Sequence, residues 1–249
     1  MLDNVLEHVL NYSTYKGYGH YGVTGLEKSR YRAWVEKNNP GVDSTVATGK
    51  IDSTIGTGFH IYAEEAMKSF PGKVQLEKVY EGDIGGYKVG GTCDLVLYDD
   101  NDVATIGDWK TMKAYPAKKA FANEETDKFI KQLSLYAYMH RQNGGKTNPI
   151  GYIYVVVVGW TQRDKAVPRA FRLDLPLMND EEVEAYVKDR VEAFPEDGSA
   201  PKFDCPTWQC EHYCGVKEVC GHYNNSGFTD ERNRGCCCGK ETSRGLIQF

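Results

Sequence analysis

The sequence predicts an α/β fold, with helices flanking a central sheet, followed by a small cysteine-rich module at the C-terminus. Two apolar strand patterns separated by an acidic turn at residues 99–102 predict a hairpin. A helix-length segment then precedes a continuous apolar run at residues 152–160, which is typical of a buried central strand. After Pro195 the composition shifts to Gly, Pro and Cys. We therefore expect residues 1–198 to form one domain and residues 199–249 a second, smaller module.

Each expected element depends on its periodicity and on the residues that end it. One helical pattern of apolar residues stops at Pro71, and another stops at Gly144. Acidic residues occupy the first turn of a further helical pattern at residues 180–194, where the helix dipole favours negative charge. The segment at residues 113–119, which is rich in lysine, is expected to be a loop. The expected helices cover residues 26–37, 59–70, 124–142 and 180–194, and the expected strands cover residues 74–80, 89–98, 103–112, 152–160 and 169–175.

The composition is that of an ordinary globular protein. The chain has 249 residues, of which 41% are hydrophobic and 26% are charged. The net charge of −5 argues against a passive nucleic-acid coat, but it is compatible with an enzyme that has a local basic groove. No apolar stretch approaches the roughly 18 residues of a membrane span, and the N-terminus lacks the pattern of a signal peptide. We therefore expect a cytoplasmic protein without a membrane partner, in a bacterial or phage-infected cell.

Two carboxylates and a lysine stand at informative positions on the predicted hairpin. Thirteen residues separate Asp94 from Asp108, and Lys110 follows two positions later. A hairpin of this length brings Asp94 beside the other two, and strand alternation places Asp108 and Lys110 on one face. A lone Asp at a strand end is more often simply solvated. The combination, however, can hold a divalent metal and activate water against a phosphodiester.

Two helices add polar residues at helical spacing. Gln132 and Tyr136 are four residues apart on the long predicted helix, so both can face one groove. His60 and Glu64 have the same spacing on the earlier helix. Each also fits an ordinary structural role, with Tyr136 as a core residue and His60 as a packed or surface residue.

Taken in chain order, four motifs resemble those of the RecB-type nuclease branch of the PD-(D/E)xK superfamily. In this sequence they are Thr57-Gly58-Phe59-His60, Gly90-Gly91-Thr92-Cys93-Asp94, Asp108-Trp109-Lys110-Thr111 and Gln132-Leu133-Ser134-Leu135-Tyr136. The resemblance covers roughly residues 20–160, and Lys28-Ser29-Arg30-Tyr31 adds a weaker match to that branch's Ser-x-Arg segment. It implies a restriction-endonuclease-like core, which is a central mixed sheet flanked by helices.

The resemblance also implies a metal centre. Asp94 and Asp108 would be metal ligands, the backbone carbonyl of Trp109 would add a third oxygen, and His60 would complete a mixed N/O set for Mg²⁺ or Mn²⁺. Glu64, one turn from His60, is a second candidate.

The same resemblance implies catalytic roles for three further residues. Lys110 would orient or deprotonate the attacking water and stabilise the charge that develops on the phosphate. Gln132 and Tyr136 would position the scissile strand or the Lys110 side chain.

The C-terminal segment holds seven of the eight cysteines. Cys205, Cys210, Cys214 and Cys220 follow the spacing C-x4-C-x3-C-x5-C, which can close around a metal centre. RecB-like nucleases such as the CRISPR-associated adaptation exonucleases and helicase-nuclease subunits carry a [4Fe–4S] cluster, with three cysteines after the nuclease core and one before it. This chain departs from that pattern because no cysteine precedes Cys93, so the fourth ligand would come from the tail.

Zinc is the alternative to the iron–sulfur cluster, with His212 or His222 as further ligands. We expect Cys93 to be a small buried apolar residue. We expect Cys236-Cys237-Cys238 to lie in a disordered tail, with alternative metal ligands or oxidation-prone surface thiols as the other interpretations.

The expected function is metal-dependent hydrolysis of DNA, by an exonuclease acting on single strands or ends in recombination, repair or phage DNA processing. One alternative is a catalytically silent nuclease-derived module that binds DNA. Another is a recruitment module whose cysteine-rich part docks a helicase or recombinase. The complete set of Asp94, Asp108 and Lys110 favours catalysis.

Overall fold

The protein is described here by a computed structural model that covers residues 4–11, 21–42, 50–192, 194–195, 197–205 and 214–221. The chain divides into two compact units. The larger unit comprises residues 1–27 and 51–192, and the smaller unit comprises residues 28–50 and 193–249. Residues 28–50 therefore group with the C-terminal segment rather than with the sheet. The predicted domain boundary near residue 198 stays a prediction.

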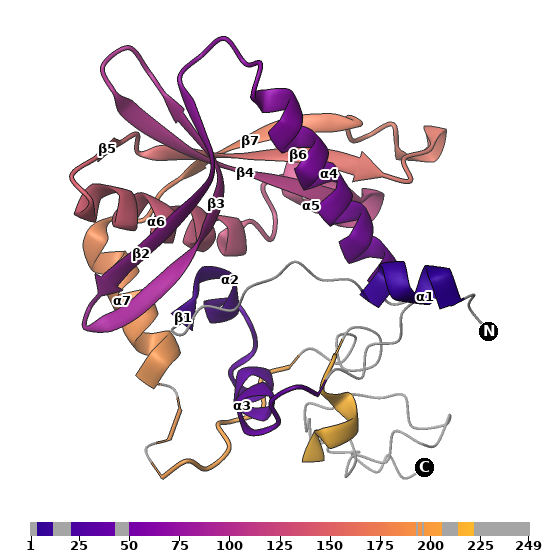
Figure 1. Cartoon of the computed structure of the whole chain (residues 1–249), viewed down its shortest axis with the longest axis vertical. Coiled ribbons are helices and arrows are strands. Elements are labelled where there is room, and N and C mark those ends of the chain that lie inside the picture. The colour runs from indigo at the N-terminus through magenta and orange to yellow at the C-terminus, as the bar shows by residue number, and fades with distance from the viewer. Residues whose placement is uncertain are drawn as a thin grey trace, which may run out of the picture. The chain divides into compact units, whose positions relative to one another are not determined.

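A mixed sheet forms the centre of the larger unit (Figure 1). In the described residues it has seven strands, in the order β1-β3-β4-β6-β7, with β2 added to β3 and β5 to β4. The strands β2, β3 and β4 form an antiparallel meander, β4 and β6 are parallel, and β6 and β7 are antiparallel. The strands are β1 (Tyr21–Gly22), β2 (Val74–Ile84), β3 (Tyr87–Tyr98), β4 (Val103–Lys113), β5 (Lys146–Thr147), β6 (Ile150–Val158) and β7 (Ala170–Pro176).

Helices cover the sheet, with α4 in front of the strands and α6 behind them in Figure 1. The helix α6 has the most extensive buried face, which includes Leu133, Leu135 and Met139, and it packs against β2, β4 and β6. The helices of the larger unit are α1 (Asn4–Asn11), α2 (Val23–Leu26), α4 (Ile51–Met67), α5 (Ala114–Phe121), α6 (Asp127–Gln142) and α7 (Asp180–Glu192). The predicted central mixed sheet flanked by helices is therefore confirmed.

Several helices differ from the sequence expectation. The helix expected at residues 26–37 begins at Arg30, and α1 and α2 were not expected. The helix α4 begins at Ile51, eight residues before the expected start at Phe59, so the glycines between them lie inside the helix. The helix α5 occupies a segment where a loop was expected. Its Pro116 lies in the first turn, where a missing N–H costs little, and Ala117 and Ala120 are buried at helical spacing.

The sheet splits between β3 and β4. These strands pair only near the turn that joins them, from Leu95 opposite Gly107 to Tyr98 opposite Ala104. The earlier part of β3 pairs with β1 at Val89 and Gly90. Beyond that last pair, β4 continues along β6 alone. Asp94 and Asp108 are the next residues on the two strands, so both lie where β3 and β4 separate.

The smaller unit packs the helix α3 (Arg30–Asn38) with cysteine-containing segments. Two side chains cap the N-terminus of α3. Ser29 Oγ accepts a hydrogen bond from the backbone N–H of Arg32, and the Asp204 carboxylate accepts hydrogen bonds from the backbone N–H groups of Arg30 (2.9 Å) and Tyr31 (3.1 Å). Val35, Cys214 and Val216 form its buried cluster, with Tyr31 and Trp34 packed against them.

No helix in the described part of the chain combines the length and apolar character that crossing a membrane requires.

Candidate active site

Asp94 and Asp108 are held at the split by different partners. Asp94 Oδ2 accepts a hydrogen bond of 2.9 Å from the backbone N–H of Trp109, which occupies the place that a strand partner would take. Asp108 Oδ1 accepts a hydrogen bond of 2.7 Å from Gln132 Nε2 on α6. Asp108 is 2% exposed, and the Asp94 side chain is 12% exposed. Both carboxylates are thus largely removed from water and fixed by the fold.

Lys110 forms an ion pair with the buried carboxylate. Its Nζ lies 2.6 Å from Asp108 Oδ2, and its side chain is 26% exposed. The contact is not a well-aligned hydrogen bond, so this buried oxygen retains capacity to coordinate a cation. Burial by itself would lower the pKa of Lys110, but the charges of Asp108 and Asp94 outweigh it and raise the pKa. The lysine is therefore a cation, suited to orienting water and stabilising negative charge.

His60 approaches the other carboxylate from α4. Its Nδ1 lies 3.3 Å from Asp94 Oδ2, and its side chain is 31% exposed. The neighbouring Phe59 ring contacts the Trp109 ring edge to face at 6.1 Å, which fixes this part of α4 against β4. Gly56 lies so close to β4 that an added Cβ would meet Thr111 Oγ1 at 3.2 Å. His60 therefore lies beside Asp94, and its role as a metal ligand stays a prediction.

The centre carries unbalanced negative charge. Burial, followed by the charge of Asp108, raises the pKa of Asp94 to about 6, against the opposing effects of His60 and the Trp109 N–H. No three His, Cys, Asp or Glu side chains among the described residues converge at metal-ligand spacing. Instead, Lys110 contacts one carboxylate and His60 the other. The donor types near the split, carboxylate oxygens and one imidazole nitrogen, are nevertheless types that Mg²⁺ or Mn²⁺ accepts.

Gln132 and Tyr136 on α6 contact the two strands that carry the aspartates. Gln132 is 8% exposed and holds Asp108. The Tyr136 hydroxyl donates a 2.7 Å hydrogen bond to the carbonyl of Thr92, two residues before Asp94. Gly91 permits this approach, because an added Cβ would lie 2.8 Å from the Tyr136 hydroxyl oxygen. Both residues therefore fix the strands that carry the carboxylates, and their catalytic roles stay predictions.

Sequence reasoning missed Glu77 on β2. It lies between the strand pairs Leu76–Leu95 and Lys78–Cys93, level with Asp94. Burial, then the charges of Asp94, Glu64 and Asp108, raises the pKa of Glu77 to about 7. Glu77 is seventeen residues before Asp94 in an ordinary alternating strand, and nothing in its local sequence marks it.

The predicted cysteine ligands are only partly within the described residues. Cys214 and Cys220 are buried, and the half-buried Cys205 has its Sγ 2.8 Å from Ser29 Oγ. Burial raises the pKa of Cys205, and Cys214 lies near enough to contribute. The remaining predicted positions lie outside the described residues, namely Cys210, His212, His222, Cys236, Cys237 and Cys238. Cys93 is fully buried, as predicted, and burial raises its pKa.

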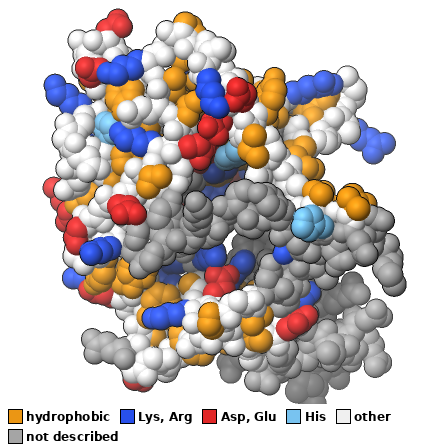
Figure 2. All heavy atoms as spheres, viewed as in Figure 1, with side chains coloured by type: hydrophobic (Ala, Val, Ile, Leu, Met, Phe, Trp, Pro, Cys, Tyr) orange, Lys and Arg blue, Asp and Glu red, His pale blue; other side chains and the backbone are white. Residues whose placement is uncertain are grey.

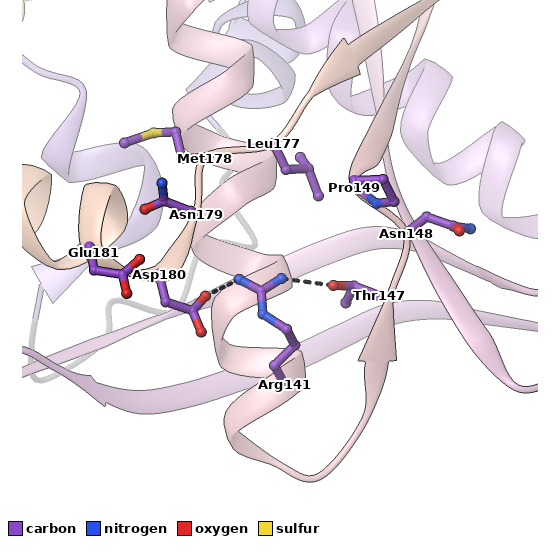
Figure 3. A pocket seen from close by; sticks show the side chains of 9 residues that line it. All are labelled: Arg141, Thr147, Asn148, Pro149, Leu177, Met178, Asn179, Asp180 and Glu181. Atoms are coloured by element: carbon purple, nitrogen blue, oxygen red, sulfur yellow. Dashed lines mark hydrogen bonds and ion pairs between the residues drawn. The ribbon is translucent and has the colours of Figure 1, made fainter.

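A pocket of about 480 Å³ lies at the far end of α6 from Gln132 (Figure 3). Arg141 crosses its floor, donating to Thr147 Oγ1 at 2.7 Å and pairing with Asp180 on α7. Glu181 adds a further acidic side chain, so the pocket offers no uncompensated cation to an anionic ligand. The contacts of Arg141 connect α6 with β5 and α7. None of the predicted site residues lines this pocket.

The described surface shows no broad basic face in the view of Figure 2, where basic, acidic and hydrophobic side chains are interspersed. This agrees with the net charge of −5.

Comparisons with known proteins identify the family of this chain. The crystal structure of SSO0001 is similar with a TM-score of 0.54 at 17% identity, covering 87% of this chain and 92% of that one. The structure of LHK-Exo in complex with dAMP gives a TM-score of 0.40 at 10% identity, covering 70% of this chain and 89% of that one. No curated protein sequence matches significantly. The family model of the PD-(D/E)XK nuclease superfamily matches residues 23–221. With most of its length matched by that model, the chain belongs to the PD-(D/E)XK nuclease superfamily.

Proposed function

We propose that this protein is a metal-dependent deoxyribonuclease, and that it acts as an exonuclease on single strands or DNA ends. The observation that carries the proposal is the placement of Asp94, Asp108 and Lys110 together where β3 and β4 diverge. Family membership supports nuclease chemistry.

Asp94, Asp108, the Trp109 carbonyl and His60 would hold Mg²⁺ or Mn²⁺, the ions typical of this superfamily. When bound, such an ion polarises the phosphate and lowers the pKa of water. The protein prepares the donors. Gln132 keeps the Asp108 carboxylate oriented through Oδ1 and leaves Oδ2 directed at the centre. The Trp109 N–H holds Asp94 in the same way.

Lys110 supplies the mobile positive charge. Its pKa is raised, so it enters the reaction protonated, with its Nζ beside Asp108. An ammonium group at that place orients a water molecule by donating a hydrogen bond to its oxygen, and it stabilises charge that grows on the phosphate oxygens. The geometry supports this role better than proton abstraction by a neutral amine.

We further propose that Cys205, Cys210, Cys214 and Cys220 hold a [4Fe–4S] cluster, with Zn²⁺ as the alternative. The support is that the three described thiols are buried or half-buried in the smaller unit. Such a centre would stabilise the fold rather than take part in hydrolysis. We also propose that the protein acts in the cytoplasm in recombination, repair or phage DNA processing, with a helicase or recombinase as a partner.

The test is cleavage of end-labelled single- and double-stranded DNA, and of closed circles, with Mn²⁺, Mg²⁺ or EDTA. Asp108→Asn and Lys110→Met should abolish cleavage, while the exposed controls Asp100→Asn and Lys118→Met should retain it. Sparing of circles would establish the exonuclease mode. Metal-replete wild-type protein that leaves every DNA form intact would overturn the proposal and favour a silent DNA-binding module.

A further inference from the structure

The connection between β6 and β7 concentrates positive charge in an acidic chain. Residues 159–169, here called the β6–β7 tip, contain Arg163, Lys165 and Arg169 and one acidic residue, Asp164. Three cations and one acid give the tip a net charge of +2, whereas the whole chain carries −5. The other 238 residues therefore carry −7, which makes the tip a local exception. Figure 1 shows the tip projecting beyond the ends of β6 and β7.

The tip is held in one shape by its own hydrogen bonds. Thr161 and Asp164 form a capping box around the turn Gln162–Asp164, in which the Thr161 N–H donates to Asp164 Oδ2 at 2.9 Å. The Trp160 indole N–H donates a 2.9 Å hydrogen bond to the carbonyl of Val167, whose side chain is buried. A turn that is already ordered pays little further entropy when it binds a ligand. The charged side chains are therefore presented from a fixed backbone.

The cations of the tip are not taken up by carboxylates. Arg163, Lys165 and Arg169 are all exposed. Within the described part of the chain, no ion pair joins any of the three to an acidic side chain. Asp164 Oδ2 accepts its hydrogen bonds from Thr161, and those bonds, with a smaller effect from the charge of Arg163, lower the pKa of Asp164. The tip therefore offers positive charge to an anionic ligand.

Arg169 is also oriented by an aromatic ring. Its guanidinium carbon lies 4.4 Å from the centre of the half-buried Trp160 ring. A guanidinium stacked in this way keeps its N–H edge available for the two parallel hydrogen bonds that a phosphate accepts. Basic side chains beside an aromatic ring are the usual composition of surfaces that bind nucleic-acid strands. The chemistry of the tip thus fits a phosphodiester backbone.

The tip lies at the end of the sheet toward which the catalytic strands separate. β3 and β4 part at Asp108, and from there β4 runs along β6. Asp108 lies opposite Ile153 in this parallel pair. Five residues further, Lys113 lies opposite Val158, directly before the tip. That stretch of strand spans about 16 Å, which corresponds to about five nucleotides at the 3.4 Å rise of B-DNA.

We propose that the β6–β7 tip is a second DNA-binding surface, which contacts the phosphate backbone of the substrate about five nucleotides from the scissile bond. This inference rests on the proposed nuclease function and names the surface that holds the remainder of the bound strand. The contact is to phosphates, so it is independent of base sequence. It adds affinity for DNA long enough to reach the tip and takes no part in the chemical step.

The test measures DNA binding by the full-length protein without added divalent ions, using the fluorescence anisotropy of a labelled single strand of roughly twenty nucleotides. The variant Arg163→Gln with Lys165→Gln removes two charges of the tip. We expect its affinity to fall about tenfold near 0.1 M salt, with an unchanged Tm. The slope of log K against log salt should become shallower by about 1.4, because each phosphate contact to a single strand contributes about 0.7. Unchanged affinity and slope would overturn the proposal.

Two control variants separate the charge of the tip from other effects. Lys73→Gln with Lys146→Gln removes the same charge at the opposite end of β4. Arg163→Lys with Lys165→Arg keeps the charge of the tip and exchanges only the side chains. Both should bind DNA as the wild type does. A loss in either control as large as that in the tip variant would show that the charges at this place are not what binds DNA.

The outcome is separable from that of the nuclease assay. Wild-type protein that cleaves DNA, combined with a tip variant that binds DNA normally, removes only this inference. Binding that depends on the tip, without any cleavage by metal-replete wild-type protein, removes the nuclease proposal and keeps the tip as a DNA-binding surface.

Discussion

Replacing Gln132 by methionine tests whether the buried Asp108 depends on its single amide donor. The Gln132 Nε2–Asp108 Oδ1 bond is 2.7 Å long, and the residues are 8% and 2% exposed. A hydrogen bond to a charged group contributes roughly 1.5–3 kcal/mol, and its loss leaves a buried carboxylate oxygen unsatisfied. Methionine nearly preserves the volume of glutamine, so packing should add little. We therefore expect Gln132→Met to lower the free energy of unfolding by about 2–3 kcal/mol.

For a chain of this size, that loss corresponds to a fall in Tm of about 4–12 °C. The assay is urea unfolding and thermal melting in EDTA, so that bound metal does not mask the effect. Gln142→Met is the control, because Gln142 is exposed at the end of the same helix and should change stability by no more than about 0.5 kcal/mol. A loss in Gln132→Met no larger than that of the control would show that α6 does not hold the carboxylate.

Three further outcomes follow from the described contacts. The folded-state pKa of Asp94 is raised to about 6, so its stabilising contribution is complete below about pH 4 and is lost as the pH rises through 6. Urea unfolding of the metal-free protein should show the free energy of unfolding falling by up to roughly 3 kcal/mol over this range. Asp94→Asn should lack this decline. Asp204→Ala removes the acceptor of two backbone N–H groups at the start of α3 and should lower the stability of this helix by about 1–2 kcal/mol. Hydrogen exchange of the helix amides measures this loss, with the exposed Asp197→Ala as the control. Cys214→Ala should lower the Tm while leaving the metal dependence of cleavage unchanged, and an unaltered Tm with lost cleavage would contradict a structural role for the thiol.

Local patterns carried enough information to predict the central part of the larger unit. The strand patterns around Asp94 and Asp108 and the length of the turn between them required an antiparallel hairpin, which β3 and β4 form. The helical periodicity after Glu124 predicted a long helix, which α6 forms. The four-residue spacing of Gln132 and Tyr136 places both on one face of α6, and Gln132 bonds to Asp108 from that face. These features depend on neighbours in sequence, and neighbour spacing is what periodicity reports.

Other features were invisible because they depend on contacts between distant segments. The start of α4 was placed too late. Glycine weakens a helix in isolation, but Gly56 lets α4 pack closely on β4 at Thr111. The helix α5 was missed because its short apolar pattern gains stability only from burial of Ala117 and Ala120 against the sheet.

The sequence by itself determined the order of the motifs, the hairpin that carries the two aspartates, and the helix that supplies Gln132. Only the tertiary structure decided that β3 leaves β4 at Asp94, that Glu77 comes level with that carboxylate, and that residues 28–50 group with the cysteine-containing segment. The physical reason is that local spacing sets which face a side chain occupies. Strand divergence, register with a third strand and long-range capping are set by packing between segments that the sequence keeps far apart.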